Sequence, residues 1–183
     1  MKKTLLVLAT VALSTSVMAQ TSGKYYSDVM YGAVTMKDTS SSSLGSFNTS
    51  LARLSFGSVV ADNLAVEGFI TQGLASDSKT IQGVKVELKT KTGYAVAIRP
   101  FIKANENIEI FGRLGYMNNE AELTASANGR SASLTNKSTR YMYGVGATYK
   151  INSGLSAVVD YTSLENKEEA DVSLLSIGLR FNF

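Results

Sequence analysis

The sequence contains no cysteine, no histidine and no tryptophan, and it has a single proline among its 183 residues. Because cysteine is absent, the chain forms no disulfide bond and offers no thiolate ligand to a metal. Because histidine is absent, it cannot build a Ser-His-Asp site, a Cys-His site or the usual zinc site. The remaining Ser, Lys, Asp and Glu residues show no spacing typical of another active site. We therefore expect no enzyme, no catalytic residue, no metal and no cofactor.

Long apolar runs are also missing beyond the N-terminus, so no transmembrane helix is expected there. The N-terminus itself has two lysines, a short apolar stretch from Leu5 to Leu13, and small residues ending at Ala19. This pattern is typical of a secretory signal peptide cleaved before Gln20. A membrane anchor is the alternative, but about 20 apolar residues are needed to span a bilayer. The sequence predicts a signal peptide at 1–19 and one exported domain at 20–183.

The charge of the chain is nearly balanced. Lys and Arg number 18 and Asp and Glu number 15, which gives a formal net charge of +3. Two of the lysines belong to the predicted signal peptide, so the exported domain is close to neutral. A nucleic-acid-binding protein usually carries a concentrated basic surface. We therefore expect no nucleic acid as a partner.

An alternation of apolar and polar residues with a period of two runs through the rest of the chain. In the last segment, Leu175, Ile177, Leu179 and Phe181 alternate with small, polar or charged residues. Such alternation separates two faces of a β-strand, whereas a helix would scatter these residues around its axis. The pattern predicts eight strands, at residues 25–36, 50–60, 64–75, 86–100, 108–118, 140–151, 154–164 and 173–183.

The connections between these segments alternate in length. Short turns are expected at 61–63, 103–107 and 152–153, and long polar loops at 37–49, 76–85, 120–139 and 165–170. Eight strands joined in this way form an up-and-down antiparallel meander. The predicted fold class is therefore all-β, an eight-stranded antiparallel up-and-down barrel, with the short turns and both termini at one end.

The orientation of the two faces decides between a membrane barrel and a soluble one. About 12 residues at ~3.3 Å each can cross a bilayer core even when tilted. The polar face is rich in glycine, which would leave room for larger side chains inside a narrow barrel. The apolar face, on which we place Leu88, carries aromatic residues near both ends: Tyr94, Tyr116, Tyr143, Tyr149, Tyr161 and Phe183. These would form interfacial girdles in a transmembrane barrel. A secreted lipocalin-like ligand-binding barrel is the alternative.

The signal peptide, the alternation of short and long connections, and the ending from Leu175 to Phe183 together resemble a known family. The chain is similar to the small eight-stranded outer-membrane β-barrels of Gram-negative bacteria: the OmpA transmembrane domain, the OmpX/Ail proteins and the opacity-type proteins of the porin family. The resemblance implies a place among outer-membrane lipid and lipopolysaccharide. It also implies that the barrel assembly machinery reads Phe181 and Phe183. Enzymes of this class generally depend on histidine, which this chain lacks. We expect a monomer.

The polar face predicts a network of ion pairs in the lumen, because an isolated buried charge is costly. Its expected members are Asp28, Arg53, Glu67, Arg99, Glu109, Arg113, Lys150, Asp160 and Arg180. Arg99 should pair with Glu109 across the turn, and Glu67 should lie at the depth of Arg180. One hypothesis is a sealed, structural lumen, with function in surface loops that bind a host or phage ligand. The other is a narrow channel for small or hydrophobic solutes.

Overall fold

A computed structural model describes residues 24–38, 45–81, 83–165 and 170–183. The predicted signal peptide at 1–19 lies outside the described residues. The eight strands are β1 (Tyr25–Asp38), β2 (Ser46–Ala61), β3 (Leu64–Ile81), β4 (Val84–Lys103), β5 (Ile108–Ala127), β6 (Arg130–Lys150), β7 (Leu155–Leu164) and β8 (Ala170–Asn182). Among the described residues, no helix is long and apolar enough to cross a membrane.

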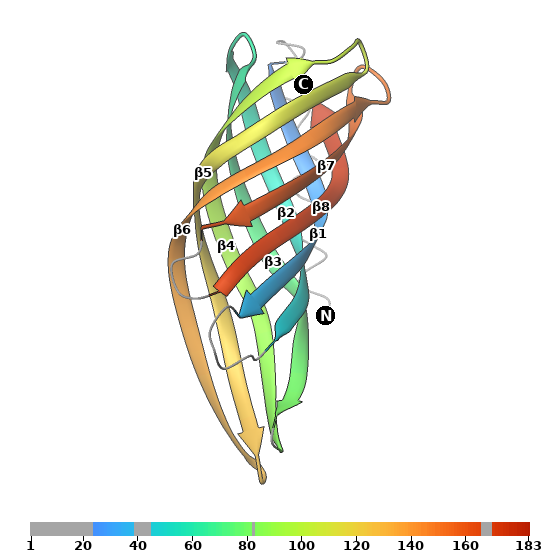
Figure 1. The fold of residues 1–183 in the computed structure, drawn as a ribbon. Coiled ribbons are helices and arrows are strands. Elements are labelled where there is room, and N and C mark those ends of the chain that lie inside the picture. The colour runs from blue at the N-terminus through green and yellow to red at the C-terminus, as the bar shows by residue number, and fades with distance from the viewer. Residues whose placement is uncertain (1–23, 39–44, 82, 166–169) are drawn as a thin grey trace.

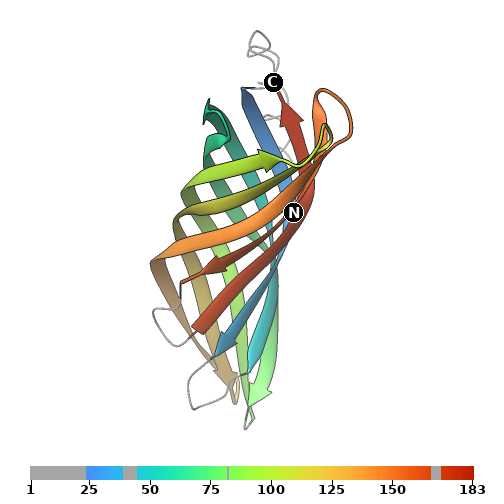
Figure 2. The ribbon, with the colours of Figure 1, turned by 45° about the horizontal axis from the view of Figure 1, so that its top comes forward.

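The strands form one closed barrel in which each strand pairs with its neighbours in the sequence. Every pairing is antiparallel, and β1 closes the ring against β8, with Asp28 opposite Arg180. The strands tilt across the barrel wall (Figures 1 and 2). The predicted eight-stranded up-and-down barrel is thus confirmed.

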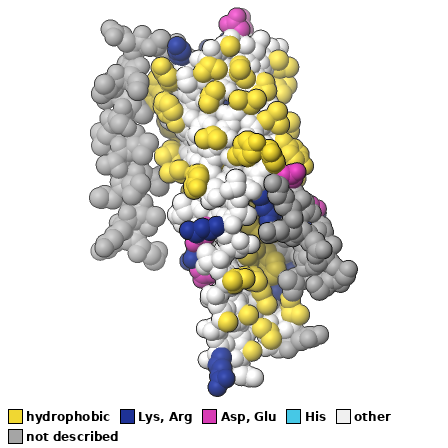
Figure 3. Space-filling model, turned by 90° about the vertical axis from the view of Figure 1, so that its left-hand side faces the viewer, with side chains coloured by type: hydrophobic (Ala, Val, Ile, Leu, Met, Phe, Trp, Pro, Cys, Tyr) yellow, Lys and Arg dark blue, Asp and Glu magenta, His cyan; other side chains and the backbone are white. Residues whose placement is uncertain are grey.

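The apolar side of the strands faces outward. In β8, Leu175, Ile177 and Leu179 are 56%, 64% and 42% exposed, whereas Arg180 is 3% exposed. The same alternation holds in the other strands, and Figure 3 shows many apolar side chains spread over the barrel wall. An apolar exterior around a polar interior suits a bilayer, and it is the reverse of a lipocalin-like barrel that binds ligands inside. The soluble alternative is therefore wrong.

Two of the predicted long loops are instead extensions of strands. Residues 76–81 continue β3, 84–85 belong to β4, and 120–139 continue β5 and β6, so that both pairs of strands project beyond the barrel, away from the end where the C-terminus lies (Figure 1). The β5–β6 hairpin turns at Asn128 and Gly129, whose φ angles are +50° and +75°. A two-residue turn with two positive φ angles matches the twist of the strands that it joins. We call these extensions the projecting sheet, made of 76–81, 84–90, 119–127 and 130–138.

A bulge in β4 changes the side to which Leu88 points. The pairing of β4 with β5 shifts register between Thr90 and Gly93, and both of these residues are buried. Beyond that shift, Leu88 is only 9% exposed. The prediction that Leu88 lies on the outer face is wrong, because the extra residue of a bulge inverts the alternation.

The lumen is packed with side chains, and glycine provides the room. A Cβ atom at Gly57 would lie 2.1 Å from Cζ of Tyr26, and one at Gly146 would lie 2.3 Å from Cζ of Phe111. Both rings lie in the apolar cluster nearer the short turns. A second apolar cluster, which includes Leu51, Met142 and Leu174, fills the lumen nearer the projecting sheet.

Candidate functional site

The most concentrated group of charges is an ion-pair network inside the barrel, which we call the lumen network. Its members are Asp28, Arg53, Glu67, Arg99, Glu109, Arg113, Asp160 and Arg180. They project inward from every strand except β6. That strand adds a neutral partner, because Thr148 accepts a hydrogen bond from Arg99 at 3.3 Å.

Glu67 is the centre of the network. Its Oε2 accepts a hydrogen bond from Nε of Arg113 at 2.8 Å. Its Oε1 lies 3.3 Å from Nε of Arg99 and 3.5 Å from Nη2 of Arg180. The hydroxyl of Tyr26 also donates to Oε1 at 2.7 Å. One fully buried carboxylate therefore bridges three arginines and a tyrosine.

Two further carboxylates, Asp160 and Asp28, also bind arginines of the network. Oδ1 of Asp160 accepts a hydrogen bond from Nη1 of Arg53 at 3.2 Å. Oδ2 of Asp160 lies 3.0 Å from Nη1 of Arg113. Asp28 binds Arg180 in a bidentate manner at 2.7 and 2.9 Å. A bidentate arginine–carboxylate pair is strong and fixes the geometry of both groups.

Glu109 joins two arginines at the short-turn end of the network. Its Oε1 accepts from Nη2 of Arg99 at 2.7 Å and lies 3.8 Å from Nη1 of Arg180. The network as a whole holds four arginines and four carboxylates, so its formal charges cancel. Mutual compensation of this kind is what allows charges to be buried.

Aromatic rings fill the space between the charged groups. The guanidinium of Arg99 lies 3.8 Å from the ring centroid of Phe111, and that of Arg180 lies 3.7 Å from Tyr26. Arg53 lies 5.3 Å from the ring of Phe69. These are cation–π distances. Together with the ion pairs, the rings occupy the lumen at this depth.

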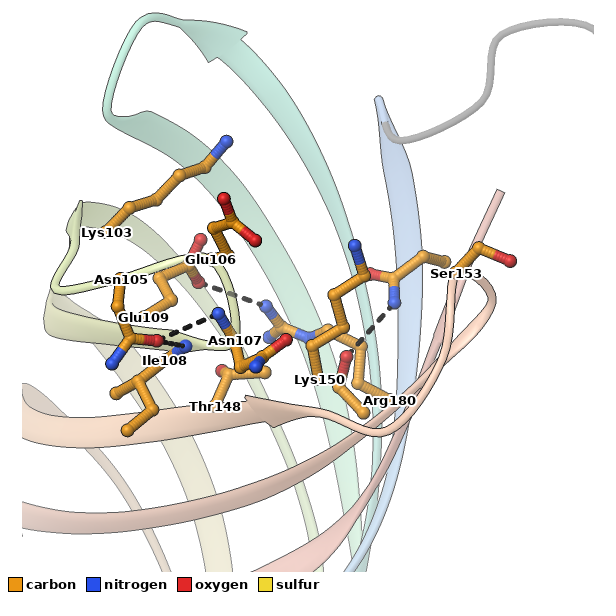
Figure 4. Close-up of a pocket in the computed structure, with 12 residues that line it drawn as sticks. Lys103, Asn105, Glu106, Asn107, Ile108, Glu109, Thr148, Lys150, Ser153 and Arg180 are labelled. Carbon is orange, nitrogen blue, oxygen red and sulfur yellow. Dashed lines mark hydrogen bonds and ion pairs between the residues drawn. The ribbon is translucent and has the colours of Figure 1, made fainter.

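Lys150 does not belong to the lumen network. Its side chain is exposed at the short-turn end and has no ion-pair partner among the described residues. It lines a recess of about 560 Å³ at the barrel mouth, together with Lys103, Glu106 and other polar residues (Figure 4). The expectation that Lys150 joins the buried pairs is wrong. Lys150 has the inward phase of Thr148, but it is the last residue of β6, so its side chain lies at the rim of the barrel, where water reaches it.

Tyr26 and Thr148 belong to the site but were not identified from the sequence. Both lie on the inward face of their strands, and both bind network members. The signal was available in the alternation, because Tyr26 has the phase of Asp28 and Thr148 has the phase of Lys150. Among the described residues, no group of three or more acidic side chains could hold a metal ion.

The expected girdle tyrosines all lie on the outer face. Tyr94, Tyr116, Tyr143, Tyr149 and Tyr161 are between 48% and 61% exposed. Tyr116 also packs on Tyr141, with ring centroids 4.6 Å apart. At the C-terminus, Phe181 is 39% exposed in β8, and Phe183 follows the strand half-buried. The backbone N–H of Phe183 donates to the carbonyl of Tyr25 at 2.9 Å.

Comparison with known proteins identifies a family and several similar folds. The family model described as the outer membrane protein β-barrel domain matches residues 5–183. No curated protein matches the chain. Among solved structures, Ail of Yersinia pestis has a TM-score of 0.62 at 18% identity, over 89% of this chain and all of that one.

Two other solved structures are similar. Neisserial surface protein A has a TM-score of 0.65 at 14% identity, over 90% of this chain and 100% of that one. OprG of Pseudomonas aeruginosa has a TM-score of 0.57 at 12% identity, over 88% and 97%. At these identities the structural likeness concerns the fold alone.

Proposed function

The chain belongs to the outer membrane protein β-barrel domain family, and from this premise we propose that it is a non-enzymatic surface-interaction protein. In this proposal the sealed lumen is structural, and the projecting sheet is the part that meets other molecules. In outer-membrane barrels the short turns face the periplasm and the longer connections face outward. The projecting sheet then lies outside the cell.

The observation that carries this proposal is an unpaired sheet edge above the membrane. Within the described residues, the part of β6 at 130–139 pairs only with β5, because the pairing with β7 begins at Met142. Unpaired N–H and C=O groups along a strand can add a strand from another molecule. An edge of this length therefore supports a role in binding a partner at the surface.

The two faces of the projecting sheet differ in chemistry. On the side continuous with the lumen, three leucines form a row across the strands: Leu88 in β4, Leu123 in β5 and Leu134 in β6. Leu123 is 37% exposed and Leu134 is 69% exposed. On the other side, Glu120 and Glu122 bind Lys91, which lies next to the projecting sheet in β4. The hydrogen bond from Lys91 lowers the pKa of Glu122 and raises the pKa of Lys91, so this pair stays charged. Exposed apolar residues beside an unpaired edge are typical of interaction surfaces.

The remaining parts of the proposal concern export and insertion. We propose that residues 1–19 are cleaved as a signal peptide and that the barrel assembly machinery reads Phe181 and Phe183. We also propose that the outward tyrosines contact the interfaces of the lipid and lipopolysaccharide layers, and that the protein is a monomer. The outward exposure of those tyrosines supports their contact with the lipid interfaces.

A ligand at the cell surface fits a related case, since Ail of Yersinia pestis has been solved with the heparin analogue sucrose octasulfate.

Shortening the β5–β6 hairpin tests the surface role. Glu120 and Lys137 are cross-strand partners, so Asn128-Gly129 can join them directly if 121–127 and 130–136 are removed. We expect this variant to assemble, as judged by heat-modifiable migration of outer-membrane extracts on gels. We also expect bacteria that produce it to lose adherence to cultured epithelial cells and survival in serum. Adherence and serum survival equal to those of the parent would contradict the proposal.

Replacing Arg99 with alanine tests the alternative of a narrow channel. Arg99 is 1% exposed and joins Glu67 to Glu109, so its removal leaves buried carboxylates less well compensated. We expect a loss of stability of about 3 kcal/mol with no new conductance in planar bilayers. Stepwise conductance in the parent that Arg99→Ala changes would favour the channel instead.

A further inference from the structure

The recess at the short-turn mouth lies outside the lumen network and has its own chemistry. It measures about 560 Å³, which lies within the range of small-molecule sites. Its walls come from β4, β5, β6, β7 and β8 and from the turns after β4 and β6 (Figure 4). Because short turns of outer-membrane barrels face the periplasm, the recess opens to that compartment.

The strand register places polar side chains around this recess. Lys103 lies opposite Glu109, and Glu109 lies opposite Thr148. On the other side, Lys150 lies opposite Ser156, which lies opposite Arg180. Directly opposite residues on antiparallel strands share a face. These side chains therefore form part of a polar collar around the mouth.

Charges of both signs remain available in the collar. Arg180 and Oε1 of Glu109 are engaged in the lumen network below. By contrast, Lys103, Lys150 and Glu106 have no ion-pair partner among the residues that the structure describes. Two free ammonium groups and one free carboxylate thus line a single polar recess.

The inner side of the recess borders the lumen network, because Arg180 and Glu109 belong to both. Arg180 forms its base and is 3% exposed, held by the bidentate pair with Asp28. Beneath it lie Glu67, Arg99 and the ring of Phe111, all packed together. A molecule that enters from the short-turn end therefore meets buried side chains that are already paired with one another.

We propose that this recess binds a small zwitterion of the amino-acid or short-peptide class. Its carboxylate would lie between Lys103 and Lys150, because two ammonium groups compensate an anion there. Its ammonium group would lie against Glu106 and Oε2 of Glu109, which has no partner among the described residues. Asn107 and Ser156 supply neutral hydrogen-bonding groups in the same lining. This site is independent of the surface role proposed above, which concerns the other end of the molecule.

Binding of triglycine to the protein extracted from outer membranes in detergent tests this proposal. Triglycine carries both charges, N-acetyl-triglycine lacks the ammonium group and triglycine amide lacks the carboxylate. Calorimetric titration should detect triglycine binding, with each derivative weaker by about tenfold, because each loses a charge-assisted contact. Lys150→Gln and Glu106→Gln should each weaken triglycine by a similar factor, while Lys89→Gln, exposed at the other end, should leave it unchanged.

Three results of these titrations would overturn the proposal. No triglycine binding at millimolar concentration would overturn the site. Equal binding of triglycine and its acetyl derivative would overturn the zwitterion in favour of a simple anion. Equal weakening by Lys89→Gln would show that binding follows the overall charge of the protein and would also overturn the site. Because Lys150 and Glu106 are exposed, their variants should keep the heat-modifiable migration of the parent, which serves as the folding control.

Discussion

Replacing Glu67 with glutamine should lower the free energy of unfolding by about 3–5 kcal/mol, the range found when one partner of a buried ion pair is removed. Glu67 compensates Arg99, Arg113 and Arg180 at the same time. Glutamine keeps the size of the side chain but leaves three buried cations with one carboxylate fewer. Urea unfolding in lipid vesicles, followed by circular dichroism and by gel migration, measures the change.

Glu120→Gln is the matched control for this experiment. Glu120 also pairs with two cations, Lys91 at 3.5 Å and Lys137 at 3.3 Å, but it lies on the projecting sheet. These side chains are 25–70% exposed, and ion pairs that water can screen contribute about 0–1 kcal/mol, so this variant should be nearly as stable as the parent. Similar losses in the two variants would mean that burial is not what makes Glu67 important, and the sealed lumen would then be wrong.

Replacing Gly57 with alanine should destabilise the barrel by about 1–3 kcal/mol, the usual cost of overpacking a core. The three atoms nearest to an added Cβ all belong to Tyr26, at 2.1, 2.4 and 2.5 Å. Tyr26 cannot move freely, because its hydroxyl is hydrogen-bonded to Glu67. The same unfolding measurement applies.

A second variant separates this clash from a general effect of alanine. Combining Gly57→Ala with Tyr26→Leu removes the ring that the new Cβ would clash with. In a double-mutant cycle, the loss of stability of the double variant should therefore be smaller than the sum of the losses of the two single variants. Gly68→Ala is the control, because its Cβ would face outward and meet only the carbonyl of Ala95 at 3.8 Å. Strictly additive losses for Gly57 and Tyr26 would contradict the packing argument.

The sequence was sufficient to predict the barrel because a bilayer and a narrow lumen impose opposite chemistry on alternate residues. Residues such as Ile177 and Arg180 cannot exchange faces without placing a charge in hydrocarbon. The projecting hairpins follow no such rule, since water surrounds them and Ser and Thr suit strands and loops alike. The signal for the β5–β6 hairpin in the sequence is Asn128-Gly129, because this dipeptide is the strongest short hairpin marker.

The lumen shows a similar division. The inward phase of each charged residue follows from alternation, and the Arg99–Glu109 contact follows from the short turn between β4 and β5. The contact between Arg53 and Asp160 joins residues 107 positions apart across the lumen. Such a pairing depends on the stagger of all eight strands, which no local pattern encodes. The bulge that turns Leu88 inward is equally invisible, because nothing in its sequence marks an extra residue.

The way in which the lumen network crosses the barrel has a consequence for assembly. Asp28 and Arg180 lie at the seam where the first strand meets the last, and Arg53 of β2 finds Asp160 only on β7. An open sheet that lacks its final strands would hold these charges without their counterions. Compensation therefore arrives only with ring closure, which makes the completed barrel and its incomplete precursors differ sharply in free energy. The same charges that stabilise the finished lumen act as a penalty on every unfinished one.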